Sequence, residues 1–317
     1  MKLLPFTNDF VFKAVFSKNE DILLDLLNSF PEFSGEHKIQ TIKVLNPEIT
    51  MDSIDDKLSI LDIHAEDISN NKFLIEMQAS PQPDFSKRAL YYWAKLYSRS
   101  LKRKRKYKTL PKVYSFNFIN FKLFHDSNFF HHVFTIQEKT NPELSLTKDF
   151  EIHIIELSKF ANRLNSLNSN FETWIYALKE IQNLQEEQMK ALEQKNPKLK
   201  KAINELKFVS QNKKSRAYYD ERLKAELDYN SKMDYAFEKG YSDGIEKGIE
   251  KGIEKGVEKN RESLLSGIQI ALKLKFNSNG LKLNNEIQKI KDVTILNKIL
   301  LSIEKAKTIS DIRKIYK

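Results

Sequence analysis

The chain contains no cysteine, and it has no run of 18 consecutive apolar residues. The first absence excludes a disulfide framework, a thiolate-zinc site and a cysteine nucleophile, and it is typical of proteins in a reducing cytoplasm. The second absence argues against a membrane-spanning helix. Residues 1–9 also lack the apolar run of a signal peptide. We therefore expect a cytoplasmic protein without a membrane partner.

Glycine is scarce, and most of it is clustered. The chain has eight glycines, five of which recur at every fourth residue from Gly240 to Gly256. Each glycine inside a helix weakens that helix by about 1 kcal/mol relative to alanine. Two interpretations stay open for this tract. It is either a Gly/Ile stripe through which two helices associate into a homo-oligomer, or a flexible connector.

Acidic residues are missing from one long segment of a chain whose net charge is +10. Between Asp84 and Asp126 there are twelve Lys or Arg and no acid. Such a field attracts polyanions, and each neutralised phosphate releases counterions. The pattern predicts DNA binding close to the acidic motif described below, and its alternative is a solvated lysine-rich loop. The predicted contact residues are Lys102, Arg103, Lys104, Arg105, Lys106 and Lys108.

Hydrophobic periodicity divides the chain into an α/β part and a helical part. The predicted elements of the first part are a helix over 8–30, a strand within 37–50, a hairpin of strands over 59–65 and 72–78, a helix over 84–101, and strands over 113–119 and 150–157. They indicate a compact α/β domain over residues 1–160. The later segments are predicted to be a basic helical region (161–238), the glycine repeat tract (239–260) and a C-terminal helical region (261–317).

The predicted hairpin carries the residues with chemical potential. Because side chains alternate along a strand, Asp62 and His64 share one face, and Glu76 and Gln78 share one face of the returning strand. Two carboxylates facing each other repel unless a cation lies between them, and ligands with oxygen alone suit Mg²⁺ or Mn²⁺. The alternative is that both acids lie at the rim and pair with lysines. His64 is interpreted as a satisfied polar contact.

The spacing Asp62, then Glu76 fourteen positions later, then Gln78, resembles the PD-(D/E)XK nuclease signature. Further segments resemble one branch of that superfamily, the transposase-like proteins called recombination-promoting nucleases. These segments are Thr7–Phe16, Asp55–Lys57, Leu61–Ile63, Ile75–Gln78, Arg88–Tyr97, Tyr107–Val113 and Ile155–Phe160. The similarity in specific segments covers residues 1–160, and the glycine tract and helical C-terminus are also familiar in that branch.

The resemblance implies a restriction-endonuclease-like core, with a central mixed sheet flanked by helices, followed by an all-helical C-terminal region. It also implies a metal-dependent DNA endonuclease associated with recombination or mobile elements. Asp62 and Glu76 match the metal ligands for Mg²⁺ or Mn²⁺. Gln78 stands where the superfamily usually has lysine, so it orients the attacking water but brings no positive charge. Contacts to the DNA backbone predict low sequence specificity.

The motif does not identify which further residues assist the two acids and Gln78. Lys57, Lys87 and Arg88 are candidates for the missing positive charge, and Asp9 is either a third acid or a helix cap. Two other functions remain as alternatives: a catalytically inactive DNA-binding accessory protein of recombination, and a helical self-assembly protein.

Overall fold

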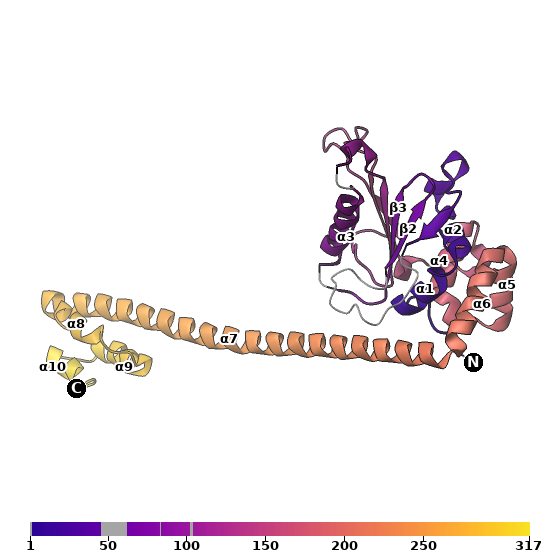
Figure 1. The fold of residues 1–317 in the computed structure, drawn as a ribbon. Coiled ribbons are helices and arrows are strands. Elements are labelled where there is room, and N and C mark those ends of the chain that lie inside the picture. The colour runs from indigo at the N-terminus through magenta and orange to yellow at the C-terminus, as the bar shows by residue number, and fades with distance from the viewer. Residues whose placement is uncertain (1, 46–61, 83, 102–103) are drawn as a thin grey trace. The chain divides into compact units, whose positions relative to one another are not determined.

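A computed structural model describes residues 2–45, 62–82, 84–101 and 104–317 (Figure 1). By its packing the chain divides into two units, Met1–Leu227 and Asp228–Lys317. The sequence-based domain boundary at residue 160 differs from this division. The difference arises because helices that follow residue 160 supply part of the hydrophobic core of the first unit.

The first unit alternates helices and strands before it becomes helical. Its main elements are α1 (Asp9–Phe16), α2 (Glu20–Asn28), the 3-10 turn η1 (Pro31–Phe33), β1 (Ile42–Val44), β2 (Ile63–Asp67), β3 (Lys72–Gln78), α3 (Phe85–Ser100), β4 (Val113–Ile119), β5 (His131–Phe134), β6 (Phe150–Glu156), α4 (Asn170–Glu180), α5 (Glu186–Lys195), α6 (Pro197–Gln211) and the start of α7 (Lys213–Leu281).

The described strands form one mixed sheet in the order β1-β2-β3-β4-β6-β5. The pairs β3–β4 and β4–β6 are parallel, while β1–β2, β2–β3 and β5–β6 are antiparallel. In Figure 1, α3 lies on one side of this sheet, and α1, α2 and α4–α6 lie on the other. This arrangement confirms the predicted fold class of a central mixed sheet flanked by helices.

Alternation along the strands gives the sheet two apolar faces. Phe73 and Ile75 of β3 are fully buried in a large core that they share with α1, α2, α4, α5 and α6. Val113 of β4 faces the opposite way, into a smaller core under Trp93 of α3, whose indole Nε1 donates to the Val113 carbonyl at 2.8 Å. Each face is therefore closed by a different set of helices.

Two sequence-based expectations about local structure differ from the fold. The helix expected over 8–30 is two helices, because Asn19 adopts a non-helical conformation (φ −127°, ψ 78°) and its side chain donates to the Val15 carbonyl at 2.8 Å. Strand β5 was not expected at all. It is an edge strand that pairs with β6 and contains two half-buried and two exposed residues, so its hydrophobic signal is weak.

The other expected strands agree with the structure, apart from their ends. The hairpin strand predicted over 59–65 begins at Ile63 in the described chain and runs to Asp67, while residues 59–61 lie outside the described residues. The strand over 113–119 has its predicted ends, and that over 150–157 ends at Glu156.

The second unit is helical, as expected. It contains the rest of α7, α8 (Asn284–Ile287), α9 (Val293–Ile303) and α10 (Ile309–Arg313), and α7 departs from helical geometry at Asn277 (φ 52°, ψ −138°). Its core residues are Ile268, Leu272, Leu283, Ile287, Leu296, Ile299, Ile303, Ala306 and Ile312.

The glycine repeat tract is helical and lies within α7. A Cβ added at any of the five glycines from Gly240 to Gly256 would meet no atom within 4 Å. The isoleucines of the tract, such as Ile249 and Ile253, are exposed. Self-association through this face stays a prediction. The helices of the described chain include none that is long and apolar enough to cross a membrane.

The shared core makes a prediction about stability. Leu206 of α6 is fully buried against the sheet unit, whereas Phe208 of the same helix is 67% exposed. Leu206→Ala should lower the free energy of unfolding by about 2–5 kcal/mol, and Phe208→Ala should change it by less than about 0.5 kcal/mol. Chemical denaturation followed by tryptophan fluorescence measures both. A Leu206→Ala protein whose first unit unfolds at the parental denaturant concentration would contradict the shared core.

Candidate active site

The hairpin of β2 and β3 brings the two predicted acidic ligands together. The strands pair with Ile63 opposite Ile75 and His64 opposite Leu74. Asp62 immediately precedes β2, and continuing the register by one residue puts it opposite Glu76. Residues opposite each other in an antiparallel pair project to the same face, with Cβ atoms about 4.5–5.5 Å apart. Both carboxylates thus project to the same face of the hairpin, where Glu76 contacts α3.

Both carboxylates are removed from water, which makes their charge costly. Asp62 is 1% exposed and Glu76 is 5% exposed. Burial raises the pKa of Glu76; the charge of Arg88 opposes this shift and that of Asp9 adds to it. The Arg88 Nη2 atom on α3 lies 3.5 Å from Glu76 Oε1. Arg88 is thus the first cation that the structure places beside the acidic pair.

A second cation comes from α1, and sequence reasoning missed it. Lys13 is 1% exposed. Burial lowers the pKa of Lys13, while the nearby negative charge of Asp62 acts in the opposite direction. The hydrophobic stripe of α1 gave no reason to single out this lysine. The feature of the sequence that could have pointed to Lys13 is that it is the one charged residue in the apolar stretch Phe10 to Phe16.

The same cation affects His64, which shares a strand face with Asp62. Burial, followed by the positive charges of Lys13 and Arg99, lowers the pKa of His64 to about 4. The imidazole is therefore neutral near pH 7 and adds no charge to the site. Its interpretation as a polar contact stays a prediction.

Asp9 lies with the site rather than at the helix cap. The cap of α1 is Asn8, whose Oδ1 accepts from the Val11 N–H at 3.2 Å, so the cap interpretation of Asp9 is wrong. Asp9 forms an ion pair with Arg222 near the start of α7. The negative charge of Asp9 also adds to the effect of burial in raising the pKa of Glu76.

Glu226, also at the start of α7, is a further acid that the sequence did not reveal. It accepts a hydrogen bond from the Ser80 hydroxyl, two residues beyond Gln78. Burial raises the pKa of Glu226, with Asp9 adding to the shift and Arg222 opposing it. Ser80 and Glu226 are 146 positions apart, so no local spacing could have indicated this contact.

A neutral oxygen lies beside Glu76 on the neighbouring strand. In the parallel pairing of β3 with β4, Glu76 is in register with Asn117, which is 1% exposed. The Asn117 Nδ2 donates to Ser115 Oγ at 3.0 Å and to the His153 carbonyl at 3.1 Å. Its Oδ1 is buried and has no hydrogen-bond partner in the described part of the chain. Amide oxygens of this kind are accepted ligands of hard cations.

The remaining predicted site residues differ in how close they lie to the acidic pair. Gln78 is half-buried at the end of β3, where its Nε2 donates to the Ser80 carbonyl at 3.2 Å. Lys87 points away from the acidic pair: its side chain is 83% exposed and its ammonium bonds Asp84 at 2.7 Å. Lys57 lies outside the described residues. Among the described auxiliary candidates, Arg88 is the one in contact with Glu76.

The basic segment lies at the other end of the sheet, which corrects the expectation that it adjoins the acidic motif. Residues 104–108 are exposed and precede β4, while Lys102 and Arg103 lie outside the described residues. Val113 pairs with Lys72 at the start of β3, whereas Glu76 and Gln78 are near its end. At about 3.3 Å per residue, the length of β3 separates the two ends by about 20 Å. The parallel connection through α3 causes this separation.

Helix α3 links the two ends and carries one sign of charge. It contains Lys87, Arg88, Lys95 and Arg99 and no acidic residue. Its sixteen residues span about 24 Å at 1.5 Å per residue, similar to the separation across the sheet. The Arg88 end contacts Glu76, and the other end leads into the basic segment.

The donor set suits a hard divalent cation. Two buried carboxylates, with the amide oxygen of Asn117 beside Glu76, offer oxygen ligands alone, and a bound cation would offset the burial that raises the pKa of Glu76. Asp9, Asp62 and Glu76 do not form a trio with all ligand oxygens within 4.8 Å in the described chain. Mg²⁺ characteristically takes one or two carboxylates and retains waters, so a pair is a sufficient donor set.

The mixed sheet flanked by helices, with buried acids at the β2–β3 hairpin, has the architecture of the restriction-endonuclease-like fold. The chain belongs to the family described as PD-(D/E)XK nuclease family transposase, which it matches over residues 6–236. The match confirms the predicted resemblance and extends it through α4–α6 to the start of α7, where Arg222 and Glu226 lie. Comparison with curated proteins finds no match, and comparison with solved structures finds none.

The raised pKa of Glu76 predicts a pH-dependent stability. Below the ordinary glutamate pKa both the folded and unfolded states are protonated and Glu76 costs nothing; as pH rises towards neutral, the unfolded state loses its proton first and stability falls. Glu76→Gln should therefore raise Tm by a few degrees at pH 7 without divalent ions, since 1 kcal/mol corresponds to about 2–4 °C. The gain should disappear near pH 4. Thermal scans across pH test this, with Glu66→Gln as control, and an equal gain at both pH values would refute it.

Proposed function

We propose that the protein is a Mg²⁺- or Mn²⁺-dependent deoxyribonuclease that hydrolyses phosphodiester bonds in DNA with low sequence specificity, in recombination or in the movement of mobile elements. The observation that supports the proposal is the hairpin register: continued one residue beyond the Ile63–Ile75 pair, it sets the buried Asp62 opposite the buried Glu76. Membership in a nuclease family supports the same reaction class. A cytoplasmic location is part of the proposal.

The side chains of the site have separate tasks. Asp62 and Glu76 would hold the divalent ion, which when bound lowers the pKa of water and stabilises charge on a phosphate. The Gln78 amide orients the attacking water by hydrogen bonding. Lys13 and Arg88 supply the positive charge that Gln78 lacks, because each lies beside one of the two acids.

The charge on α3 supports a path for the DNA. A backbone that follows the helix from Arg88 towards the segment 104–108 meets basic residues and no helix acid. Lys95 also stacks over the exposed Tyr91 ring, with 5.8 Å from its ammonium to the ring centroid. Basic side chains along such a path contact the phosphates of DNA, and phosphate contacts fix the position of DNA without reading its sequence.

A second candidate function is DNA binding without cleavage, in an accessory role in recombination. The observation that favours it is Gln78, which replaces the cationic lysine of the signature at the end of β3. A self-assembly function is favoured by the exposed isoleucines of α7. The two experiments that follow separate these functions from the nuclease.

The nuclease proposal predicts a loss of cleavage on substitution of either acid. Asp62→Asn and Glu76→Gln should each reduce Mg²⁺-dependent cleavage of linear and supercoiled DNA by at least about a hundredfold, the size of effect seen when a preorganised electrostatic group is removed. Glu66→Gln is the matched control, because Glu66 lies on the same hairpin but pairs with Lys72. Its cleavage rate should stay within about twofold of the parent.

Different outcomes of that assay support different functions. Undiminished cleavage in both acid variants would eliminate the assigned site. A parent that binds DNA but does not cut it, together with cleavage gained by Gln78→Lys, would establish the accessory function. A parent with no salt-dependent affinity for DNA would leave self-assembly as the function.

The α3 path predicts how affinity depends on salt. Lys87→Ala combined with Lys95→Ala should weaken DNA binding and lower the slope of log K against log salt by about 1 for each phosphate that is no longer neutralised. Lys104→Ala with Lys106→Ala and Lys108→Ala should also weaken binding, yet leave the single-turnover rate at saturating DNA unchanged. Fluorescence anisotropy over a salt series measures these slopes. Lys190→Ala on α5 is the control, and an equal weakening there would contradict the path.

A further inference from the structure

A second cluster of potential ligands lies on the opposite face of the sheet from the acidic pair. Glu32 of η1, His131 of β5 and His153 of β6 each offer a ligand atom, and these atoms all lie within 4.8 Å of one another. His153 is fully buried and its ring stacks on Phe116, which belongs to the core beneath α1 and α2. Glu76, in contrast, contacts α3.

Hydrogen bonds prepare His153 as a ligand. Its Nε2 lies 2.9 Å from Glu151 Oε1, and Glu151 is held in turn by the Lys112 ammonium at 2.6 Å. A carboxylate on Nε2 keeps the proton there, which leaves the lone pair on Nδ1. That Nδ1 lies 3.0 Å from His131 Nε2, inside the cluster. A histidine ligand whose second nitrogen donates to a carboxylate is the usual arrangement at metal centres.

His131 is suited to the same task by its position. Its Nε2 lies 3.0 Å from His153 Nδ1, so one imidazole of the pair donates and the other accepts. Without a cation, His131 would donate to His153 Nδ1; with one, the proton would occupy the other nitrogen of His131, with no net change in charge.

Glu32 is the member that a simple hydrogen-bonded histidine pair does not explain. Its Oε2 atom is buried and has no hydrogen-bond partner in the described part of the chain. A buried carboxylate oxygen without a partner is costly. A cation shared with the two imidazoles would satisfy it, and would also make the close approach of two neutral rings and a carboxylate favourable.

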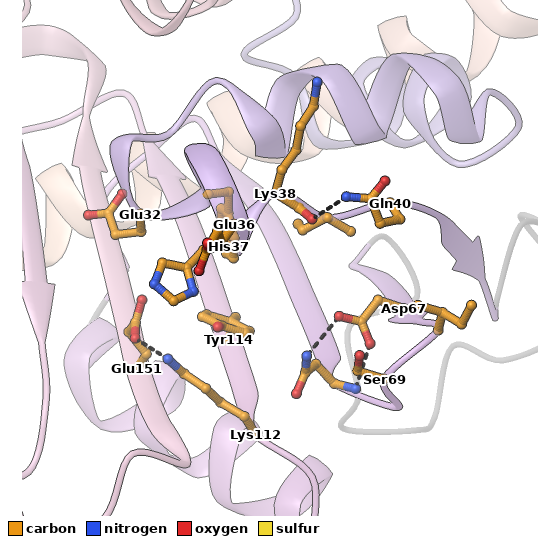
Figure 2. A pocket seen from close by; sticks show the side chains of 14 residues that line it. Glu32, Glu36, His37, Lys38, Gln40, Asp67, Ser69, Lys112, Tyr114 and Glu151 are labelled. Atoms are coloured by element: carbon orange, nitrogen blue, oxygen red, sulfur yellow. Dashed lines mark hydrogen bonds and ion pairs between the residues drawn. The ribbon is translucent and has the colours of Figure 1, made fainter.

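One member of the cluster, Glu32, lines an open pocket. Glu32 and Glu151 both line a cavity of about 560 Å³, and Figure 2 shows them with Lys112, which bonds Glu151. His37 and Glu36 line the same cavity but do not belong to the cluster. A water molecule would complete the coordination, since three protein donors leave one position open.

We propose that Glu32, His131 and His153 bind a transition-metal cation of the zinc class, separate from the hard cation of the acidic pair. Two imidazoles and one carboxylate match the preference of Zn²⁺, whereas oxygen-only sites suit Mg²⁺. Bound metal would tie η1 to β5 and β6, which are far apart in the sequence. The role that follows is a stabilising metal site at the edge of the sheet.

Zinc binding to the full chain, stripped of metal with a chelator, tests the site. Isothermal titration with Zn²⁺ and elemental analysis should give one equivalent per chain. The same result is expected for the double variant Asp62→Asn/Glu76→Gln, in which the acidic pair is removed. Glu32→Gln and His131→Ala should each bind Zn²⁺ at least about tenfold more weakly, and His37→Ala should bind as the parent does.

Thermal denaturation provides the readout that is independent of cleavage. Zn²⁺ should raise Tm of the parent and of His37→Ala, and at the same Zn²⁺ concentration it should raise Tm of Glu32→Gln by less. If His131→Ala fails to fold, Glu32→Gln decides alone, because Glu32 is half-buried in a 3-10 turn. Parental zinc affinity in Glu32→Gln, no zinc binding by the parent, or loss of binding in the Asp62/Glu76 double variant would each overturn the proposal.

Discussion

Buried negative charge at the end of the β2–β3 hairpin is the constraint around which the first unit is organised. Asp62 and Glu76 are both nearly inaccessible, and burial raises the pKa of Glu76. A sheet can hold such groups only if positive charge comes from other elements. α3 contributes Arg88, and α1 contributes Lys13. The packing of these helices on the sheet is thus also what supplies the electrostatics of the site.

Strand direction decides what the rest of the molecule can contribute. Because β3 and β4 run parallel, the chain must return through α3 to the end of the sheet where β3 begins before it can enter β4. The exposed basic segment 104–108 therefore lies at the opposite end of the strands from Glu76, although the two are close in sequence. α3 spans that distance with four cations and no acid.

The hairpin of β2 and β3 could be predicted from the sequence, because it follows from local two-residue alternation. The common face predicted for Asp62 and Glu76 follows from the same alternation. The sequence could not show Lys13, Glu226 or Asn117, since each meets the site through a contact between distant segments. The boundary after Leu227 was missed for a related reason: α6 looks like an ordinary amphipathic helix until its Leu206 side is seen against the sheet core. Strand β5 was not predicted, because an exposed edge strand has few apolar residues to mark it in the sequence.

The two faces of the sheet present different ligand chemistry, and alternation explains how they stay apart. Neighbouring residues of one strand point to opposite sides, so β4 can place Asn117 beside Glu76 and Phe116 against the His153 ring. Glu76 and Asn117 lie on the α3 face, while His131 and His153 lie on the other face beside Phe30 and Phe116. The strand backbones and apolar side chains between them separate the groups. A hard cation and a borderline one can then be distinguished by ligand type within a single small sheet.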